Sequence, residues 1–273
     1  MNVPAPEPLL LTDRQDGVLR LTLNRPRARN ALSSALMSEM QAALDAAADA
    51  RVIVIAAEGP VFSSGHDLKE LNASRADGDA GKAAFAALFT QCSKLMQTIV
   101  RHPLPVIAEV QGVATAAGCQ LVASCDLAVA SSLARFATPG VDIGLFCSTP
   151  MVALSRNVPR KAAMEMLLTG DMLDAERARA IGLISHVVPP EILTAETMAL
   201  AARIASKPRA TVKTGKEAFY RQLEMPLADA YAYASQVMTE NMLAADAKEG
   251  ICAFLEKREP NWNNPLSPSG GEG

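Results

Sequence analysis

The sequence predicts an α/β protein with a helical region at its C-terminal end. Apolar, β-favouring segments alternate with amphipathic segments over the first two-thirds of the chain, and the last quarter has no strand pattern. Of the 273 residues, 49% are hydrophobic and 20% are charged, which allows a sizeable core and excludes disorder over most of the chain. We place a boundary at residue 206, with the core over 1–206 and the helical region over 207–273.

Five segments are predicted to be strands. The second of them, residues 51–57, is continuously apolar, which is typical of a strand buried on both faces. The strands span residues 18–23, 51–57, 105–110, 127–130 and 185–188.

Helical periodicity accounts for most of the remaining chain. Predicted helices span residues 32–48, 81–101, 114–124, 149–157, 160–169, 174–181, 192–205, 208–223, 227–243 and 246–257. A helical region with an apolar face outside a complete core needs a covering surface, so we expect oligomerisation. The Pro-, Gly-, Asn- and Ser-rich tail over 261–273 is expected to be frayed.

Net charge and cysteine usage argue against several classes of protein. A net charge of −3 argues against a general nucleic-acid binder, and no run of 18 uncharged apolar residues predicts a membrane span. The five cysteines show no CxxC spacing and no metal-ligand pattern with the three histidines, and they indicate reduced thiols. The N-terminal residues fit neither a secretory signal nor an arginine-rich transit peptide. We therefore expect a cytoplasmic protein that binds no metal, nucleic acid or membrane.

Two loops rich in small residues follow predicted strands and lead into helices. They span residues 63–69 and 111–120. Small side chains let a ligand approach backbone N–H groups closely, and two facing loops could hold one oxygen as an oxyanion hole does. The spacing alone favours two ordinary strand-to-helix turns. Neither loop matches the glycine pattern of a dinucleotide or Walker-type site.

Short motifs are distributed along nearly the whole chain, and their order and spacing are specific enough to be compared with those of known families. They include Asn24-Arg25-Pro26, Phe62-Ser63-Ser64-Gly65-His66-Asp67, Gly118-Cys119-Gln120-Leu121, Cys125-Asp126, Leu168-Thr169-Gly170 and Phe254-Leu255-Glu256-Lys257. With these motifs the chain resembles the crotonase superfamily, the enoyl-CoA hydratases and isomerases. The resemblance implies a crotonase-like spiral of ββα units with a C-terminal helical trimerisation region, assembled as a homotrimer or a dimer of trimers. It also implies a coenzyme A thioester as substrate and no permanently bound cofactor.

The resemblance also assigns the residues of the site. The backbone N–H groups of His66 and Ala117 would form the oxyanion hole around the thioester oxygen. Substrate contacts, some of them from a neighbouring subunit, would come from Arg27, Ala28, Ser64, Asp67, Cys147, Phe254 and Lys257. Considered alone, Arg27 and Lys257 are better interpreted as solvated charges, and Asp67 as a helix N-cap.

The chain departs from the family pattern where hydratases carry two catalytic glutamates. The first position is Gln120 and the second is Gly140. Glutamine cannot accept a proton at neutral pH, although its amide can orient a water, and glycine leaves the acid/base position vacant. Each such group is worth roughly 10²–10⁴-fold in rate, so ordinary hydration is expected to be weak or absent. Asp142, two residues further on, is a candidate substitute.

Two other polar residues receive non-catalytic interpretations. Glu109, inside an apolar strand, is expected to form a structural salt bridge or to accept hydrogen bonds at the strand end. The side chain of His66 is expected to face the loop or coenzyme A rather than to act as a base.

The sequence thus predicts an acyl-CoA-processing enzyme of fatty-acid or related metabolism, a lyase or isomerase that uses the oxyanion hole without the usual glutamates. The alternative is an acyl-CoA-binding protein whose catalytic site is degraded. A peptide hydrolase of the same fold is less favoured, because no Ser/Lys or similar dyad can be placed.

Overall fold

Two β-sheets form the framework of the protein, whose computed structural model describes residues 7–262. The larger sheet has the order β1-β2-β3-β5-β7-β10, with strands at Leu10–Gln15, Val18–Leu23, Val52–Ala57, Val106–Val110, Leu127–Ser131 and His186–Val188. The smaller sheet has the order β4-β6-β8-β9, with strands at Val61–Ser63, Val113–Thr115, Arg135–Ala137 and Leu173–Asp174. The β1–β2 and β8–β9 pairs are antiparallel, and the other pairs of these described strands are parallel.

The strands and helices repeat as ββα units. β3 and β4 lead into α2 (Leu68–Ala73) and α3 (Lys82–Arg101), and β5 and β6 lead into α4 (Ala117–Ser124). β7 and β8 lead, through the 3-10 helix η3 (Pro139–Ile143), into α5 (Pro150–Asn157). Because β3, β5 and β7 are neighbours in one sheet and β4, β6 and β8 in the other, each unit advances along both sheets. The predicted spiral of ββα units is confirmed.

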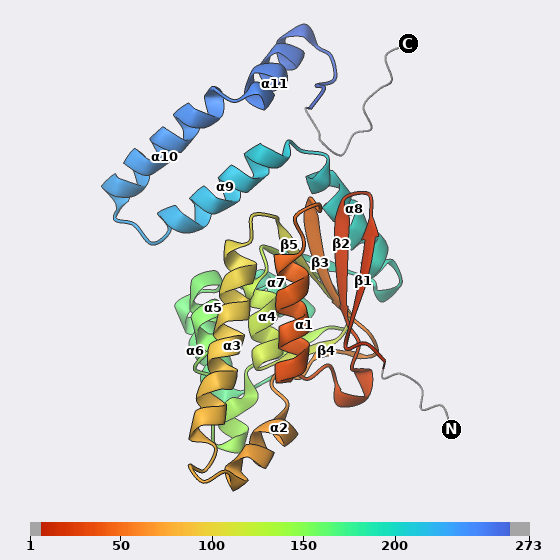
Figure 1. Cartoon of the computed structure of the whole chain (residues 1–273), viewed down its shortest axis with the longest axis vertical. Coiled ribbons are helices and arrows are strands. Elements are labelled where there is room, and N and C mark those ends of the chain that lie inside the picture. Colours follow the sequence, from red (N-terminus) through yellow and green to blue (C-terminus); the bar gives the residue numbers. More distant parts are fainter. Residues whose placement is uncertain (1–6, 263–273) are drawn as a thin grey trace.

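The larger sheet is covered on both faces, as its apolar strands require. Side chains alternate along β3, so that Ile53 and Ile55 join the main core while Val52 and Val54 face α8 (Leu193–Ala205). The remaining short helices are η1 (Pro26–Ala28), α1 (Ser34–Asp45), η2 (Ser74–Ala76), α6 (Arg160–Thr169), α7 (Ala175–Ala180) and η4 (Pro190–Ile192). α1 and α3 lie side by side over the main core (Figure 1).

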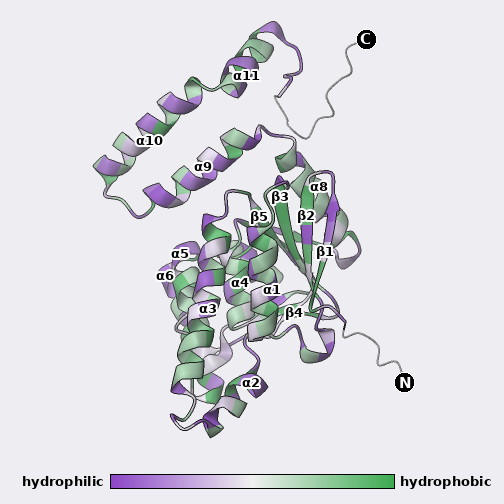
Figure 2. Cartoon of the chain, viewed as in Figure 1, coloured by the Kyte–Doolittle hydropathy of each residue, from purple (hydrophilic) through white to green (hydrophobic). Residues whose placement is uncertain are grey.

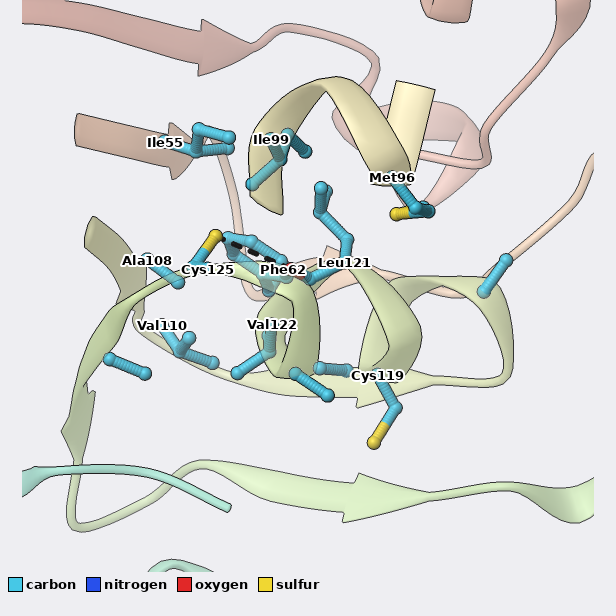
Figure 3. Packing of buried hydrophobic residues seen from close by; sticks show 14 of the residues in the cluster. Ile55, Phe62, Met96, Ile99, Ala108, Val110, Cys119, Leu121, Val122 and Cys125 are labelled. Atoms are coloured by element: carbon cyan, nitrogen blue, oxygen red, sulfur yellow. Dashed lines mark hydrogen bonds between the residues drawn. The ribbon is translucent and has the colours of Figure 1, made fainter. Parts of the chain in front are cut away.

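α4 lies at the centre of the main core, and all eight of its residues are buried. Leu121 points toward Met96 and Ile99 of α3, and the Cys125 thiol donates to the Leu121 carbonyl over 3.3 Å (Figure 3). Gly118 allows α4 to touch β4, because a Cβ there would lie 2.3 Å from the carbonyl oxygen of Ser63. This contact seats the start of α4 against the loop that follows β4.

The C-terminal helices differ in how they are attached to the core. α9 (Arg209–Gln222) is tied down by Lys216, whose Nζ donates to Asp126 Oδ2 over 2.7 Å and to the carbonyls of Ile99 and Leu104. α10 (Leu227–Met242) and α11 (Ala245–Glu256), which we call the arm, project away from the sheets (Figure 1). The division at residue 206 stays a prediction, and the tail expected to be frayed lies mostly outside the described residues.

Apolar side chains on the arm are exposed to solvent. Hydrophobic and hydrophilic residues alternate along both helices of the arm (Figure 2). The exposed fractions include 76% for Leu227, 83% for Leu243 and 82% for Phe254. No described helix is both long enough and apolar enough to span a membrane.

Candidate active site

The two small-residue loops identified in the sequence face each other in the structure. Gly65 has φ +89°, and a Cβ there would lie 2.9 Å from Cβ of Ala116 and 3.1 Å from the amide nitrogen of Ala117. The Ala117 amide therefore lies beside Gly65, the residue that precedes His66. Within residues 7–262, neither the His66 nor the Ala117 N–H donates a hydrogen bond. Two neighbouring backbone donors without an acceptor are what an oxyanion hole requires.

The first loop is held by the segment that follows β2. The Ser64 N–H donates to the Arg29 carbonyl over 3.0 Å, and the Leu32 N–H donates to the Gly65 carbonyl over 2.7 Å. These bonds use backbone groups on both sides of the loop and leave the His66 N–H free of a protein acceptor.

The buried amide of Asn30 in turn fixes this segment. Its Nδ2 donates to the carbonyls of Glu58 and Val61, and its Oδ1 accepts from the Arg25 N–H. A buried side-chain amide with three partners is costly to disturb, so this region is a rigid support for the loop.

The second loop contains a strained residue. Ala116 has φ +50° and ψ −119°, a conformation that residues with a Cβ rarely adopt. Its N–H donates to the Ala137 carbonyl, and its carbonyl accepts from the Gln120 N–H, both over 3.0 Å. The conformation at Ala116 aims the next N–H, that of Ala117, out of the first turn of α4.

Three side-chain atoms near these donors are buried and have no partner at good hydrogen-bond geometry among the described residues. They are Oε1 of Gln120, one turn along α4 from Ala117, and both ring nitrogens of His66. The His66 ring packs edge-on against Phe89 of α3, with centroids 5.4 Å apart. Burial lowers the pKa of His66, while a hydrogen bond to the Leu32 backbone and the charge of the Glu70 carboxylate act in the opposite direction. Unsatisfied buried polar atoms mark places where a ligand or water supplies the partner.

Gly140, the vacant glutamate position, is buried, whereas Asp142, the candidate substitute, is exposed. A Cβ on Gly140, which is buried in η3, would lie 2.9 Å from Sγ of Cys147, so the thiol fills the space beside it. Asp142 is exposed, and its carboxylate points toward Gly170 at the end of α6. Burial raises the pKa of Cys147, so this thiol is neutral at physiological pH.

Asp67 is committed to structural contacts. It caps α2 by accepting from the N–H groups of Lys69 and Glu70, as the sequence predicted, and it pairs with Arg25 over 3.0 Å. Burial works against the charge, but these hydrogen bonds hold the pKa of Asp67 below its usual value.

The predicted substrate contacts are not all brought together within one chain. Ser64 lies on the first loop, and its N–H donates to the carbonyl of Arg29, the residue that follows Arg27 and Ala28 of η1. Phe254 lies in α11 and Lys257 caps its C-terminal end. This helix is at the opposite end of the molecule from α2, which follows the first loop (Figure 1).

The structural interpretation of Glu109 is confirmed. Its Oε1 accepts from Arg20 over 2.6 Å and from Thr194 over 2.8 Å, which ties β5 to β2 and α8. The sequence reasoning missed two contributors to the site, Phe89 and the strained Ala116. No spacing or composition signal marks either of them, because each matters through a contact with the other loop or helix. No group of three or more potential metal ligands occurs among residues 7–262.

The fold and the paired donors define a crotonase-type protein, and the profile of the enoyl-CoA hydratase/isomerase family matches residues 13–265. The chain belongs to this family. It is 52% identical over 262 residues to enoyl-CoA hydratase domain-containing protein 3, mitochondrial, of Mus musculus, covering 94% of this chain and 86% of that protein. The Homo sapiens protein of the same name is also 52% identical, over 94% of this chain and 85% of its own length. The sequence segments 114–126, 136–140 and 144–150 resemble this branch of the family, and the comparison confirms the resemblance.

Solved structures show the same likeness. The crystal structure of human enoyl coenzyme A hydratase domain-containing protein 3 superposes with a TM-score of 0.89 at 52% identity, covering 93% of this chain and all of that one. An enoyl-CoA hydratase from Mycobacterium smegmatis gives a TM-score of 0.90, also at 52% identity, covering 94% of this chain and all of its own.

The comparison overturns one expectation. The mouse, rat and human relatives carry the word mitochondrial in their names, so the expectation of a cytoplasmic protein is wrong. Scattered reduced thiols indicate a reducing environment, and that criterion does not separate the cytosol from the mitochondrial interior.

Proposed function

We propose that this protein is an acyl-CoA-processing enzyme, acting in fatty-acid or related metabolism, that stabilises an enolate of a coenzyme A thioester. The observation that supports the proposal is the pair of neighbouring N–H groups of His66 and Ala117, which have no acceptor within the described chain. A developing oxyanion between them would gain two aimed donors, and one such donor is typically worth ~3 kcal/mol in the transition state.

The reaction does not use the two glutamates of a hydratase. The Gln120 amide orients a water or a substrate oxygen, in keeping with its buried, unsatisfied Oε1. Gly140 supplies no acid or base, and Asp142 reaches the reacting carbons only through a shift of η3, because it is exposed and turned toward Gly170. Hydration of an enoyl-CoA is therefore weak or absent, and isomerase or other lyase chemistry is favoured.

Coenzyme A lies across the first loop. Arg27, Ala28 and Ser64 contact it from the same chain, and Phe254 and Lys257 contact it from a neighbouring subunit. The 82% exposure of Phe254 supports a role between subunits of a homotrimer or dimer of trimers. No permanently bound cofactor takes part.

The second candidate is an acyl-CoA-binding protein without turnover, and Gln120 and Gly140 favour it. The two functions are separated by measuring turnover of crotonyl-CoA and of β,γ-enoyl-CoA thioesters of several chain lengths, beside calorimetric binding of a saturated acyl-CoA. Turnover of any of them establishes the enzyme. Binding without turnover establishes the second candidate, and absence of binding overturns both.

A further inference from the structure

The segment over residues 25–32, which joins β2 to α1, supports the residues that precede the N–H donor of the first loop. The Ser63 hydroxyl donates to the Asn30 carbonyl over 2.8 Å and in turn accepts from the Gly65 N–H over 3.3 Å. The Leu32 N–H donates to the Gly65 carbonyl over 2.7 Å. Both backbone groups of Gly65, the residue with the most conformational freedom in this loop, are therefore held by hydrogen bonds.

These contacts fix the direction of the His66 N–H. The peptide that joins Gly65 to His66 is planar and trans, so its carbonyl and its N–H point in opposite directions. Because Leu32 holds the carbonyl, the N–H is aimed to the side away from Leu32. On the other side of His66, the Arg25 guanidinium holds Asp67 over 3.0 Å. The donor is thus supported on both sides by one segment of the chain.

The side chain of Asn30 closes this segment and attaches it to the fold. Its Oδ1 accepts from the Arg25 N–H over 2.8 Å, and its own N–H donates to the Arg25 carbonyl over 2.9 Å. Its Nδ2 donates to the carbonyls of Glu58 and Val61 over 2.8 Å and 2.7 Å. One buried amide therefore joins both ends of the turn over 25–30 and ties the turn to the connection between β3 and β4.

The backbone of the turn also depends on this residue. Arg29 and Asn30 have φ +54° and +49°, two successive left-handed residues that are not glycine. Asparagine is one of the few residues with a side chain that adopts this conformation readily. A residue without the amide leaves three backbone groups without their present partner, so the turn loses its attachment as well as its shape.

We propose that Asn30 is a positioning residue of the oxyanion hole, which aims the His66 N–H through the segment over 25–32. The inference rests on the proposed function and assigns a new residue to it. Asn30 is fully buried and acts only through the residues that it holds. Arg27 and Ala28, the proposed contacts of coenzyme A, lie in the same segment, so loss of the amide is expected to weaken binding by a few-fold.

The experiment compares polarisation of a bound thioester with its affinity and with the stability of the full-length protein. Butyryl-CoA labelled with ¹³C at the carbonyl is bound, and its carbonyl stretching frequency is measured by isotope-edited infrared difference spectroscopy. Aimed donors weaken the C=O bond, so the parent protein should lower this frequency relative to that of the thioester in water. Calorimetry gives the affinity, and urea unfolding gives the stability.

Three variants separate positioning from stability. Asn30→Gly keeps the left-handed backbone without the amide and should lose about half of the parent's frequency shift, because one of two donors is no longer aimed. Asn30→Ser retains one hydroxyl and should lose less of the shift; it serves as the test if the glycine variant does not fold. Glu109→Gln breaks a buried ion pair with Arg20 and is the matched control, expected to lower stability and to keep the full shift.

The outcomes distinguish this inference from the proposed function. If the folded Asn30 variants bind butyryl-CoA with the full shift, the inference is wrong while the proposed function stands. An equal loss of shift in Glu109→Gln also overturns the inference, because general destabilisation then explains the loss. If the parent binds butyryl-CoA without lowering the frequency, or binds no acyl-CoA, the proposed oxyanion hole fails, and the inference falls with it.

Discussion

The sulfur of Cys147 occupies the space into which a side chain at Gly140 would extend. A Cβ at position 140 would lie 2.9 Å from this sulfur and 2.8 Å from the Leu145 carbonyl oxygen. The second glutamate position is thus closed by the chain's own packing rather than left as an open gap, and a side chain placed there must displace the segment over 145–147.

Placing glutamates at positions 120 and 140 tests the claim that hydration is weak because both acid–base groups are absent. The double variant Gln120→Glu, Gly140→Glu is expected to hydrate crotonyl-CoA faster than the parent. It is also expected to lose about 1–3 kcal/mol in the free energy of unfolding, because the new side chain overpacks the space at Cys147. Adding Cys147→Ala should recover part of this loss in urea unfolding. A folded double variant that binds acyl-CoA and hydrates no faster would contradict the account.

The strained backbone at Ala116 predicts that substitution by glycine stabilises the folded protein. Its φ of +50° with ψ −119° suits glycine far better than alanine. Relief of ~1–3 kcal/mol of strain exceeds the ~0.5–1 kcal/mol entropic cost of glycine, so Ala116→Gly should be about 1 kcal/mol more stable to urea. Ala117→Gly, one residue further on inside α4, is the matched control and should be less stable by about 1 kcal/mol. Equal losses for both variants would show that Ala116 is not strained.

The pair of Lys216 and Asp126 is expected to dominate the attachment of α9. The side chain of Lys216 is only 7% exposed, and all three of its acceptors lie on the core. Lys216→Met leaves Asp126 without its buried partner and should cost about 3–5 kcal/mol in the free energy of unfolding. Lys213→Met, at a half-exposed pair on the same helix, should cost under about 0.5 kcal/mol. A small loss at Lys216 would mean that α9 is held mainly by its apolar contacts.

Stability should fall in mild acid. Burial lowers the pKa of His102, with the Leu44 backbone opposing and Lys216 reinforcing the effect, so the folded protein binds this proton less readily than the unfolded chain. The same direction holds for His66. Stability is therefore fully present above the unfolded pKa of about 6.5 and is lost progressively as the pH falls from there toward the folded pKa values. Urea midpoints between pH 7.5 and 5 check this, and His102→Gln should flatten the dependence. A midpoint that rises as the pH falls through this range would show the opposite sign.

The arm should hold subunits together. Leu243 and Phe254 are each more than four-fifths exposed in the single chain, and a second subunit would cover them. Light scattering should show a trimer or hexamer for the parent, and the variant Leu243→Ser, Phe254→Ser should shift to smaller species. Leu133→Ser, at a 65% exposed leucine in the β7–β8 connection, serves as the control. A parent protein that is a stable monomer would contradict the role given to the arm.

Most long elements were predictable from the sequence, and most of the shortest strands were not. The six-residue β1 was missed, whereas the three-residue β10 was predicted. β3 is marked by a continuous apolar run and the 20-residue helix α3 by its helical pattern, and both occur close to the predicted bounds. Strands such as β4, β6 and β8 have only three residues each, too few to establish an alternation. These short strands nevertheless form the second sheet, so the ββα repeat was available only through the family resemblance.

The candidate site was predictable to a similar extent. The loops that carry His66 and Ala117 stood out by their small residues, but their approach across Gly65 depends on packing between β4, β6 and α4. Patterning could not show that Cys147 fills the space at Gly140, because the two positions come together only through the turn at the end of η3.

α3 has a consequence that extends beyond the core it covers. Near its C-terminal end the Ile99 carbonyl accepts from Lys216 over 3.2 Å, and ten residues earlier Phe89 packs against the ring of His66. The two contacts are joined by about 15 Å of continuous helix. The residue that anchors α9 and the residue that packs against the His66 ring thus lie on the same helix. Because one helix makes both contacts, the attachment of α9 and the packing of Phe89 against His66 are not independent of each other.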